Sequence, residues 1–313
     1  MHTTSDLPLN SVRKKDGRRC PRNLLTSGRP PCQRSLHAAA VLRDSLCVFG
    51  GYDGLHRVND LYEFHFPSRS WRQIITLSPL SESAGAVGVG VVTATGTVPS
   101  PRDRHTAVAH GNTFYVFGGF DGTSRVSDLY GFDVDVLAWR EVRPRMATAN
   151  AANYVAAENL LQPNPVLGVE NERGAISQQF HPPPSPRHSH AAFTKNAMYV
   201  FGGYDGSYRS DFHKFDFNQL QWSPVPASGR SPRARYRSTA CVLRDTMILF
   251  GGHDGTRHLA DVHLFDFVSQ AWSVLVARGL PPLPRDSHVS VSYKDSMYVF
   301  GGELALSTTD SFI

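Results

Sequence analysis

The chain has 313 residues, a formal net charge of +5, 41% hydrophobic residues and 11% aromatic residues. It is long and apolar enough to bury a sizeable core, but no apolar run is long enough to span a membrane. The four cysteines, Cys20, Cys32, Cys47 and Cys241, lack the C-x-x-C spacing of a zinc site. Their use is typical of a reduced intracellular protein.

The N-terminal segment is strongly basic. Residues 1–34 hold eight lysines or arginines and two aspartates, a net charge of +6 that leaves −1 for the rest of the chain. We predict that residues 1–29 form a basic disordered leader, because such polar segments bury too little apolar surface to fold. The run Arg13–Arg19 also fits a nuclear address or a contact with an anionic surface. Since no signal-peptide core precedes it, the expected location is cytoplasmic, with nuclear or endomembrane association as the alternative.

One type of segment recurs along the chain. "LCVFGGYDGLHRVNDLYEFHFPSRSW" ends at Trp71, and similar segments end at Trp139, Trp222 and Trp272, 19 or 20 residues after the second glycine of a Gly-Gly pair. A fifth copy, "MYVFGGELALSTTDSFI", begins at Met297. Such a fixed register indicates a repeat architecture. The structural repeat positions are Gly50, Gly51, Gly118, Gly119, Gly202, Gly203, Gly251, Gly252, Gly301, Gly302, Trp71, Trp139, Trp222 and Trp272.

Each repeat predicts four strands. The runs His37–Leu42 and Leu46–Phe49 are apolar on both faces, which is typical of strands buried between layers. The glycine pair ends the second strand where a side chain would block close backbone approach, and Asp-Gly then makes a turn. An alternating run with Phe64 gives a more exposed third strand, and the tryptophan marks the fourth. Because all four tryptophans share this position, we interpret them as packing residues.

The paired glycines, the spaced aromatic residue and the tryptophan resemble kelch repeats, each of which forms one blade of a β-propeller. The Asp-Gly after the glycine pair, followed by "ND", "SD" or "AD", most resembles the leucine-zipper-like transcriptional regulator group. The resemblance implies an all-β fold with four full four-stranded blades plus a truncated fifth, an incomplete or fragmentary propeller. It also implies a scaffold or adaptor that binds other proteins on a loop face.

The repeats place the blades at about 30–75, 99–143, 184–226, 230–276 and 284–313. Two low-complexity insertions, residues 76–98 and 144–183, are rich in Ala, Ser, Gly, Asn and Pro. We interpret both as flexible and dispensable, with at most a short helix near Tyr154–Leu161. Because the fifth repeat stops near its third strand, we interpret the chain as a fragment or short isoform. We expect it to self-associate through the unclosed propeller.

Histidines in the fourth repeat are the main candidates for chemistry. "GGHDGTRHLADVH" places His253, Asp254, His258, Asp261 and His263 within eleven residues, as a metal site could require. His253 and His263 stand where other repeats carry mainly tyrosine or phenylalanine, so substitution on a repeat template is the simpler interpretation. No phosphate loop or nucleophile elbow occurs. We predict no enzyme activity, no metal and no cofactor, with a metal-dependent kelch enzyme as the alternative.

Two sets of arginines accompany the repeats. The strand-start set lies three residues before the first strand's histidine or serine and consists of Arg34, Arg102, Arg187, Arg235 and Arg285. The turn set follows Asp-Gly and consists of Arg57, Arg125, Arg209 and Arg257. In an up-and-down blade both connections emerge on one face, so the two sets should meet at one rim. There they either pair bidentately with loop aspartates or form an anion-binding ring, and the two arrangements can coexist.

We expect a division of roles between the two sets. The turn set should hold the loops, and the strand-start set should point to solvent and meet an acidic segment of a partner protein. The predicted partner-binding residues are Arg102, Arg104, Arg187, Arg235 and Arg285, of which Arg104 resembles kelch positions that grip acidic peptides. The resemblance also implies the substrate-recognition part of a ubiquitin-ligase adaptor. Since no flanking segment resembles a cullin-binding domain, that role is an alternative; nucleic-acid binding by the propeller is not expected.

Overall fold

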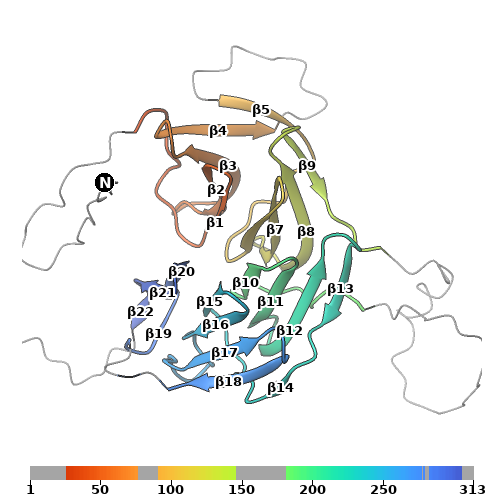
Figure 1. Ribbon diagram of the computed structural model, residues 1–313. Coiled ribbons are helices and arrows are strands. Elements are labelled where there is room, and N and C mark those ends of the chain that lie inside the picture. Colours follow the sequence, from red (N-terminus) through yellow and green to blue (C-terminus); the bar gives the residue numbers. More distant parts are fainter. Residues whose placement is uncertain (1–25, 77–90, 146–180, 277, 279–281, 305–313) are drawn as a thin grey trace, which may run out of the picture.

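The computed structural model describes residues 26–76, 91–145, 181–276, 278 and 282–304, and these ranges contain strands and turns but no helix. Accordingly, no described helix could cross a membrane. Figure 1 shows the strands grouped into sheets around a common centre, as in a β-propeller. The expected all-β fold class is confirmed. The leader up to residue 25, most of the second insertion and the helix near Tyr154–Leu161 lie outside the described residues.

Four blades have four strands each. Blade one contains β1 (Ala38–Leu42), β2 (Ser45–Tyr52), β3 (Arg57–His65) and β4 (Ser70–Thr76). Blade two contains β6 (Thr106–His110), β7 (Thr113–Phe120), β8 (Arg125–Asp133) and β9 (Ala138–Glu141). Blade three contains β10 (Ala191–Thr194), β11 (Met198–Tyr204), β12 (Tyr208–Asp216) and β13 (Gln221–Pro224). Blade four contains β15 (Thr239–Leu243), β16 (Thr246–Phe250), β17 (Val262–Asp266) and β18 (Ala271–Leu275).

The fifth blade is represented by an antiparallel hairpin of β20 (Val289–Tyr293) and β21 (Ser296–Phe300). Beside it, β19 (Arg285–Asp286) pairs with β22 (Glu303–Leu304). The first strands of the blades touch in chain order, β1 to β6, β6 to β10, β10 to β15 and β15 to β20. Together they line a central cavity of about 410 Å³ with small side chains such as Ala40, Ala107 and Ala192. The fourth strands lie at the periphery (Figure 1).

The glycine pair ties each blade to the next. In blade one Gly50 has φ +64° and Gly51 has φ +101°, the left-handed region that favours glycine. The N–H of Gly51 donates to the carbonyl of Arg102 in blade two, 2.8 Å away. A Cβ on Gly50 would lie 2.9 Å from the same carbonyl oxygen. The second glycines of the next three blades repeat the bond, donating to Arg187, Arg235 and Arg285.

Aromatic packing joins the blades in the same order. Trp139 of blade two packs on Phe49 of blade one, with ring centroids 5.2 Å apart. The same contact joins Trp222 to Phe117 and Trp272 to Phe201. These side chains are at most 4% exposed, so the interpretation of the tryptophans as packing residues is confirmed for these three. Trp71 of blade one is only half-buried, because no described blade precedes it.

One strand lies inside the first predicted insertion. β5 (Val91–Gly96) pairs in parallel with β4 of blade one and with β9 of blade two, so that the two blades form one nine-stranded sheet. A shorter segment, β14 (Ser228–Gly229), pairs in the same way with β18. The interpretation of residues 76–98 as flexible throughout is therefore wrong for Val91–Gly96, whereas their dispensability stays a prediction. The pattern of side chains did not reveal β5, because its role is to offer backbone groups to the outer strands.

Candidate functional site

Three of the strand-start arginines, Arg102, Arg187 and Arg235, are buried inside their blades. Arg102 is 0% exposed, and its guanidinium forks onto Asp128 with Nη1 2.6 Å from Oδ1 and Nη2 2.9 Å from Oδ2. Nη1 also donates to the carbonyl of Gly118, the first glycine of that blade's pair, at 3.1 Å. Nε donates to the carbonyl of Ser100. A bidentate arginine–carboxylate pair is among the strongest and most directional polar contacts in proteins.

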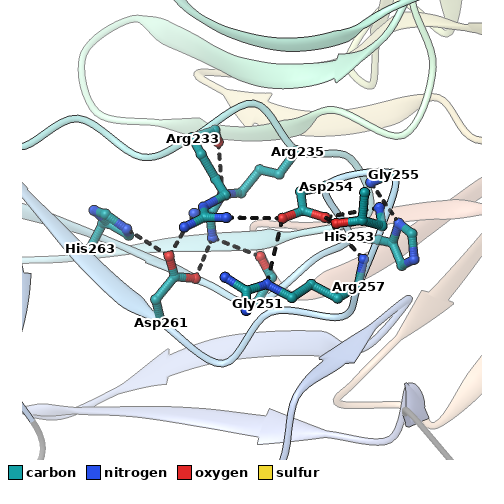
Figure 2. A network of polar contacts seen from close by, with 10 residues as sticks. Arg233, Arg235, Gly251, His253, Asp254, Gly255, Arg257, Asp261 and His263 are labelled. Carbon is teal, nitrogen blue, oxygen red and sulfur yellow. Dashed lines mark hydrogen bonds and ion pairs between the residues drawn. The ribbon is translucent and has the colours of Figure 1, made fainter.

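The same fork recurs in three other blades. Arg34 binds Asp60, Arg187 binds Asp211 and Arg235 binds Asp261, and each arginine also donates to the carbonyl of the first glycine of its blade. Figure 2 shows Arg235 between Asp261 and Gly251, with His263 also bound to the carboxylate. Burial acts to raise the pKa of Asp261, but hydrogen bonds from Arg235 and His263 outweigh it and hold this pKa below its usual range. In these four blades the fork therefore joins the strand-start segment to the glycine pair and the aspartate.

The expected solvent position of three predicted partner-binding residues is wrong. Arg102, Arg187 and Arg235 are at most 1% exposed, so a partner cannot reach their guanidiniums in the folded chain. The prediction was based on the face of the propeller where the segment before the first strand emerges. The arginine side chain instead turns back into its own blade, to the glycine carbonyl and the aspartate. Mutual pairing, the alternative left open, is what this set shows. Arg285 is partly exposed and donates to the carbonyls of Leu283 and Gly301.

The turn arginines of blades three and four lie at the surface instead. Arg209 is 45% exposed and pairs with Asp205 of its own turn. Arg257 is 65% exposed and lies 3.8 Å from Asp254 (Figure 2). Both arginines therefore pair with an aspartate of their own turn, as expected for the turn set, although much of each side chain faces solvent.

Facing side chains meet at each junction between blades. The first position of each facing pair is the residue that lies across the β-ladder from the aromatic residue or histidine before Asp-Gly. In blades one to four it is occupied by Arg57, Arg125, Tyr208 and His258. The second position belongs to the next blade and directly follows its strand-start arginine. In blades two to five it is occupied by Asp103, His188, Tyr236 and Asp286. Three of the pairs are complementary: Arg57–Asp103 at 3.1 Å, Tyr208–Tyr236 with centroids 5.3 Å apart, and His258–Asp286 at 3.4 Å. The fourth pair sets Arg125 against His188, which supplies no negative charge.

A cavity of about 540 Å³ lies at this junction between blades two and three, on the loop face. Its lining includes Arg104, Arg125, His188 and Asp205, together with Thr123, Ser124 and Ser185. Within the described residues no carboxylate pairs with Arg125, and its buried Nε has no hydrogen-bond partner. Its guanidinium carbon lies 5.1 Å from the centre of the Tyr204 ring. We call this feature the junction cavity.

The carboxylates near the junction cavity are already engaged. Arg104 lies 3.3 Å from Asp103, but Asp103 is also the partner of Arg57 at 3.1 Å. Asp205 accepts hydrogen bonds from Arg209 and Ser185, both at 2.6 Å. Of the two arginines in the lining, Arg104 therefore shares its carboxylate with Arg57, and Arg125 has none among the described residues. Of the predicted partner-binding residues, Arg104 is the one placed there.

His188 is neutral at physiological pH. Burial, followed by the positive charges of Arg104, Arg125 and Arg237, lowers its pKa to about 4. Its Nδ1 lies 3.0 Å from the hydroxyl of Ser189. The imidazole consequently adds no charge of its own to the junction cavity and does not neutralise Arg125, which has no carboxylate partner among the described residues.

The histidines of the fourth repeat point to different partners. His263 binds Asp261 inside the blade at 2.9 Å, His258 faces the next blade, and His253 Nδ1 accepts the N–H of Gly255 (Figure 2). In the described part of the chain, no three His, Cys, Asp or Glu side chains are arranged to hold a metal ion. Burial, the largest effect, raises the pKa of Cys47 to about 12, so this thiol is a poor nucleophile.

Family comparisons agree with these repeats. The Kelch motif matches residues 33–75 and 101–146, and the KLHDC2/KLHL20/DRC7 Kelch-repeats domain matches residues 166–313. The chain is a kelch-repeat protein. The kelch assignment made from the glycine pairs and tryptophans is thereby confirmed, and each kelch repeat corresponds to one blade.

Two groups of curated relatives are similar to this kelch chain. The Leucine-zipper-like transcriptional regulator 1 homolog of Drosophila melanogaster is 29% identical over 79% of the chain and 27% of its own length. The human Leucine-zipper-like transcriptional regulator 1 is 29% identical over 64% of the chain and 25% of its own length. The human Kelch domain-containing protein 3 is 27% identical over 71% of the chain and 62% of its own length. The kelch chain thus spans from 25% to 62% of the length of these relatives.

Proposed function

We propose that this kelch chain is a non-catalytic protein-interaction module that binds an acidic segment of a partner protein at the junction cavity. The observation that carries the proposal is the pair of guanidiniums, Arg104 and Arg125, that face this cavity without a full carboxylate partner. Incompletely paired arginines on a surface attract acidic partners and fix their orientation. Similarity to other kelch proteins supports binding as the mode of use, although a propeller fold alone does not decide function.

Binding of acidic peptides to purified protein tests this proposal. A labelled library rich in Asp and Glu should bind the chain, and Arg104→Ala should weaken binding roughly tenfold, since a charge-assisted hydrogen bond is lost. Added salt should weaken it further, because the site is partly open to solvent. The matched control is Arg43→Ala, which removes a half-exposed arginine paired with Asp135. Arg43 lies in the turn between β1 and β2, away from the loops that line the junction cavity. Equal losses in both variants, or no binding by the original chain, would reject the proposal.

The adaptor role extends this proposal to an assembly. We propose that the chain serves in the cytoplasm as the substrate-recognition part of a ubiquitin-ligase adaptor. Support comes from its kelch repeats and from the resemblance of its Asp-Gly turns to the leucine-zipper-like group. Precipitation of the tagged chain from cells should then recover a cullin. Its absence would reject the adaptor role while leaving the binding module in place.

A further inference from the structure

The junction between blades two and three differs from its neighbour by one missing acid. At the junction between blades one and two, Asp103 neutralises Arg57, and the Arg57 guanidinium carbon lies 4.8 Å from the centre of the Phe120 ring. At the next junction Arg125 occupies the equivalent place over Tyr204, but the facing residue is His188. Arg57 and Arg125 therefore occupy the same position in successive blades, but only Arg57 faces a carboxylate.

The donors around the junction cavity exceed what one carboxylate can accept. Two guanidiniums, Arg104 and Arg125, bring several N–H groups, and the hydroxyl-bearing residues Thr123 and Ser124 belong to the same lining. A carboxylate offers two oxygens and one negative charge. A phosphate monoester offers three terminal oxygens and a charge of about −1.5 to −2 at neutral pH. Arginine also matches phosphate in a planar, bidentate manner.

We propose that the junction cavity binds a phosphorylated serine or threonine side chain of the partner, with Arg104 and Arg125 holding its terminal oxygens. A short phosphorylated side chain can reach Arg104 from solvent, because the arginine side chain is 27% exposed. Asp205 also lines the cavity, but its carboxylate is held by Arg209 and is only 6% exposed. This inference rests on the proposed function, since it names the acidic group that the site recognises.

Three matched peptide libraries test the inference. Each has an amidated C-terminus and degenerate residues around one fixed position, which is phosphoserine, glutamate or serine. The phosphoserine library should bind at least about tenfold more tightly than the glutamate library, because it adds an oxygen acceptor and charge. If the glutamate library binds equally well and still depends on Arg104, the phosphate inference fails and the proposed function stands. If no library binds, both fail.

Substitution of His188 separates recognition from folding. His188→Asp places a carboxylate opposite Arg125, as Asp103 is placed opposite Arg57, so the internal ion pair should compete with the ligand. We expect phosphopeptide binding to fall at least about tenfold while the melting temperature is unchanged or higher. The matched neutral variant, His188→Asn, should keep binding within about twofold. Unimpaired phosphopeptide binding by the His188→Asp variant would overturn the inference.

Discussion

Arg102 joins three parts of its blade through one guanidinium, which contacts Asp128, the carbonyl of Gly118 and the segment before the first strand. Arg102→Ala should lower the free energy of unfolding by about 3 kcal/mol, because it leaves a carboxylate and a buried carbonyl without a donor. Asp128 is 27% exposed, so water offsets part of the loss and keeps it at the lower end of the range for buried pairs. Urea denaturation measures the change.

The control for this change is Arg104→Ala two residues away. Its guanidinium is 27% exposed and shares Asp103 with Arg57, so the loss of stability should stay below about 1 kcal/mol. Arg102→Lys keeps the charge but not the fork and should fall between the two variants. Similar losses for Arg102→Ala and Arg104→Ala would show that the fork is not a major support of the blade.

Buried histidines make stability depend on pH. Burial and then Arg102 lower the pKa of His105 to about 3, and burial and then Arg285 lower that of His288 to about 4. In the unfolded chain histidine titrates near 6.5. As pH falls from about 6.5 toward 4, the unfolded chain binds protons that the folded chain does not bind, so stability is lost in this window.

The expected loss is about 1.4 kcal/mol per pH unit for each such histidine. Melting curves between about pH 7 and pH 4.5 measure it. His105→Gln retains a donor for the carbonyl of Phe49, which His105 Nε2 binds at 3.1 Å, and should flatten the decline. His56→Gln replaces an exposed histidine and should leave the decline unchanged. A melting temperature that stays constant across this range would contradict the buried, neutral state of His105.

The arginine pairs could be predicted from the sequence, but their roles could not. The Arg34–Asp60, Arg102–Asp128 and Arg235–Asp261 pairs are each 26 residues apart, and Arg187–Asp211 is 24 apart. This near-constant spacing was the available signal for an architectural contact. The residue after the strand-start arginine varies instead, as Ser35, Asp103, His188, Tyr236 and Asp286. That variation locates the junction cavity, yet nothing in the sequence shows that His188 faces Arg125 from another blade.

At the scale of elements, β5 shows how the outer strand of a blade is covered. Gly96, at its end, has φ +93° and lies against Trp139, where an added Cβ would be 2.0 Å from the carbonyl oxygen. Gly28 and Gly229 meet the carbonyls of Trp71 and Trp272 in the same way. Each of these glycines lies six residues before a strand-start arginine, namely Arg34, Arg102 and Arg235. This spacing is visible in the sequence as a repeated Ser/Thr-Gly. The Ala-, Ser- and Gly-rich composition of the insertion nevertheless favoured a loop over a strand.

Gly96→Ala should be more destabilising than the same change at another left-handed glycine. Gly111 has φ +57°, and an added Cβ there meets nothing within 4 Å, so Gly111→Ala should cost only about 1–2 kcal/mol of conformational strain. Gly96→Ala adds a clash with backbone that cannot turn away, about 1–3 kcal/mol more. Thermal melts of the two variants measure the difference. Equal losses would mean that β5 is not held against β9 in solution.

At the scale of the whole molecule, the repeat period predicted the blades and their order, because each blade is specified locally. The contacts between blades are not local, and they are directional. The first-to-second strand turns of blades one, three and four reach forward with a cation: Arg43 to Asp135 in blade two, Lys195 to Asp245 in blade four and Arg244 to Asp295 in blade five. Phenylalanines reach forward to tryptophans in the same direction. The described chain therefore has two unlike end faces, one on blade one and one on blade five.

The face of blade five is apolar and uncovered in the described structure. Val289 and Phe300 pair across the hairpin, as do Val291 and Tyr298, which places all four on one face. Phe300 is 61% exposed, whereas the equivalent Phe250 of blade four is 1% exposed beneath the next blade. A contiguous aromatic face on an edge hairpin favours association with other chains.

We expect the 313-residue chain to self-associate through this face, and polar substitutions there to reduce the association. Val291→Thr combined with Phe300→Ser keeps strand-compatible residues while removing apolar area, so the apparent mass in sedimentation should fall toward that of a monomer. The melting temperature should change little, because these side chains are already exposed. The control is Val268→Ser, an isolated exposed valine, 80% exposed, in the turn between β17 and β18. A monomeric mass for the unaltered chain at all concentrations would contradict this prediction, as would equal effects of the double variant and the control.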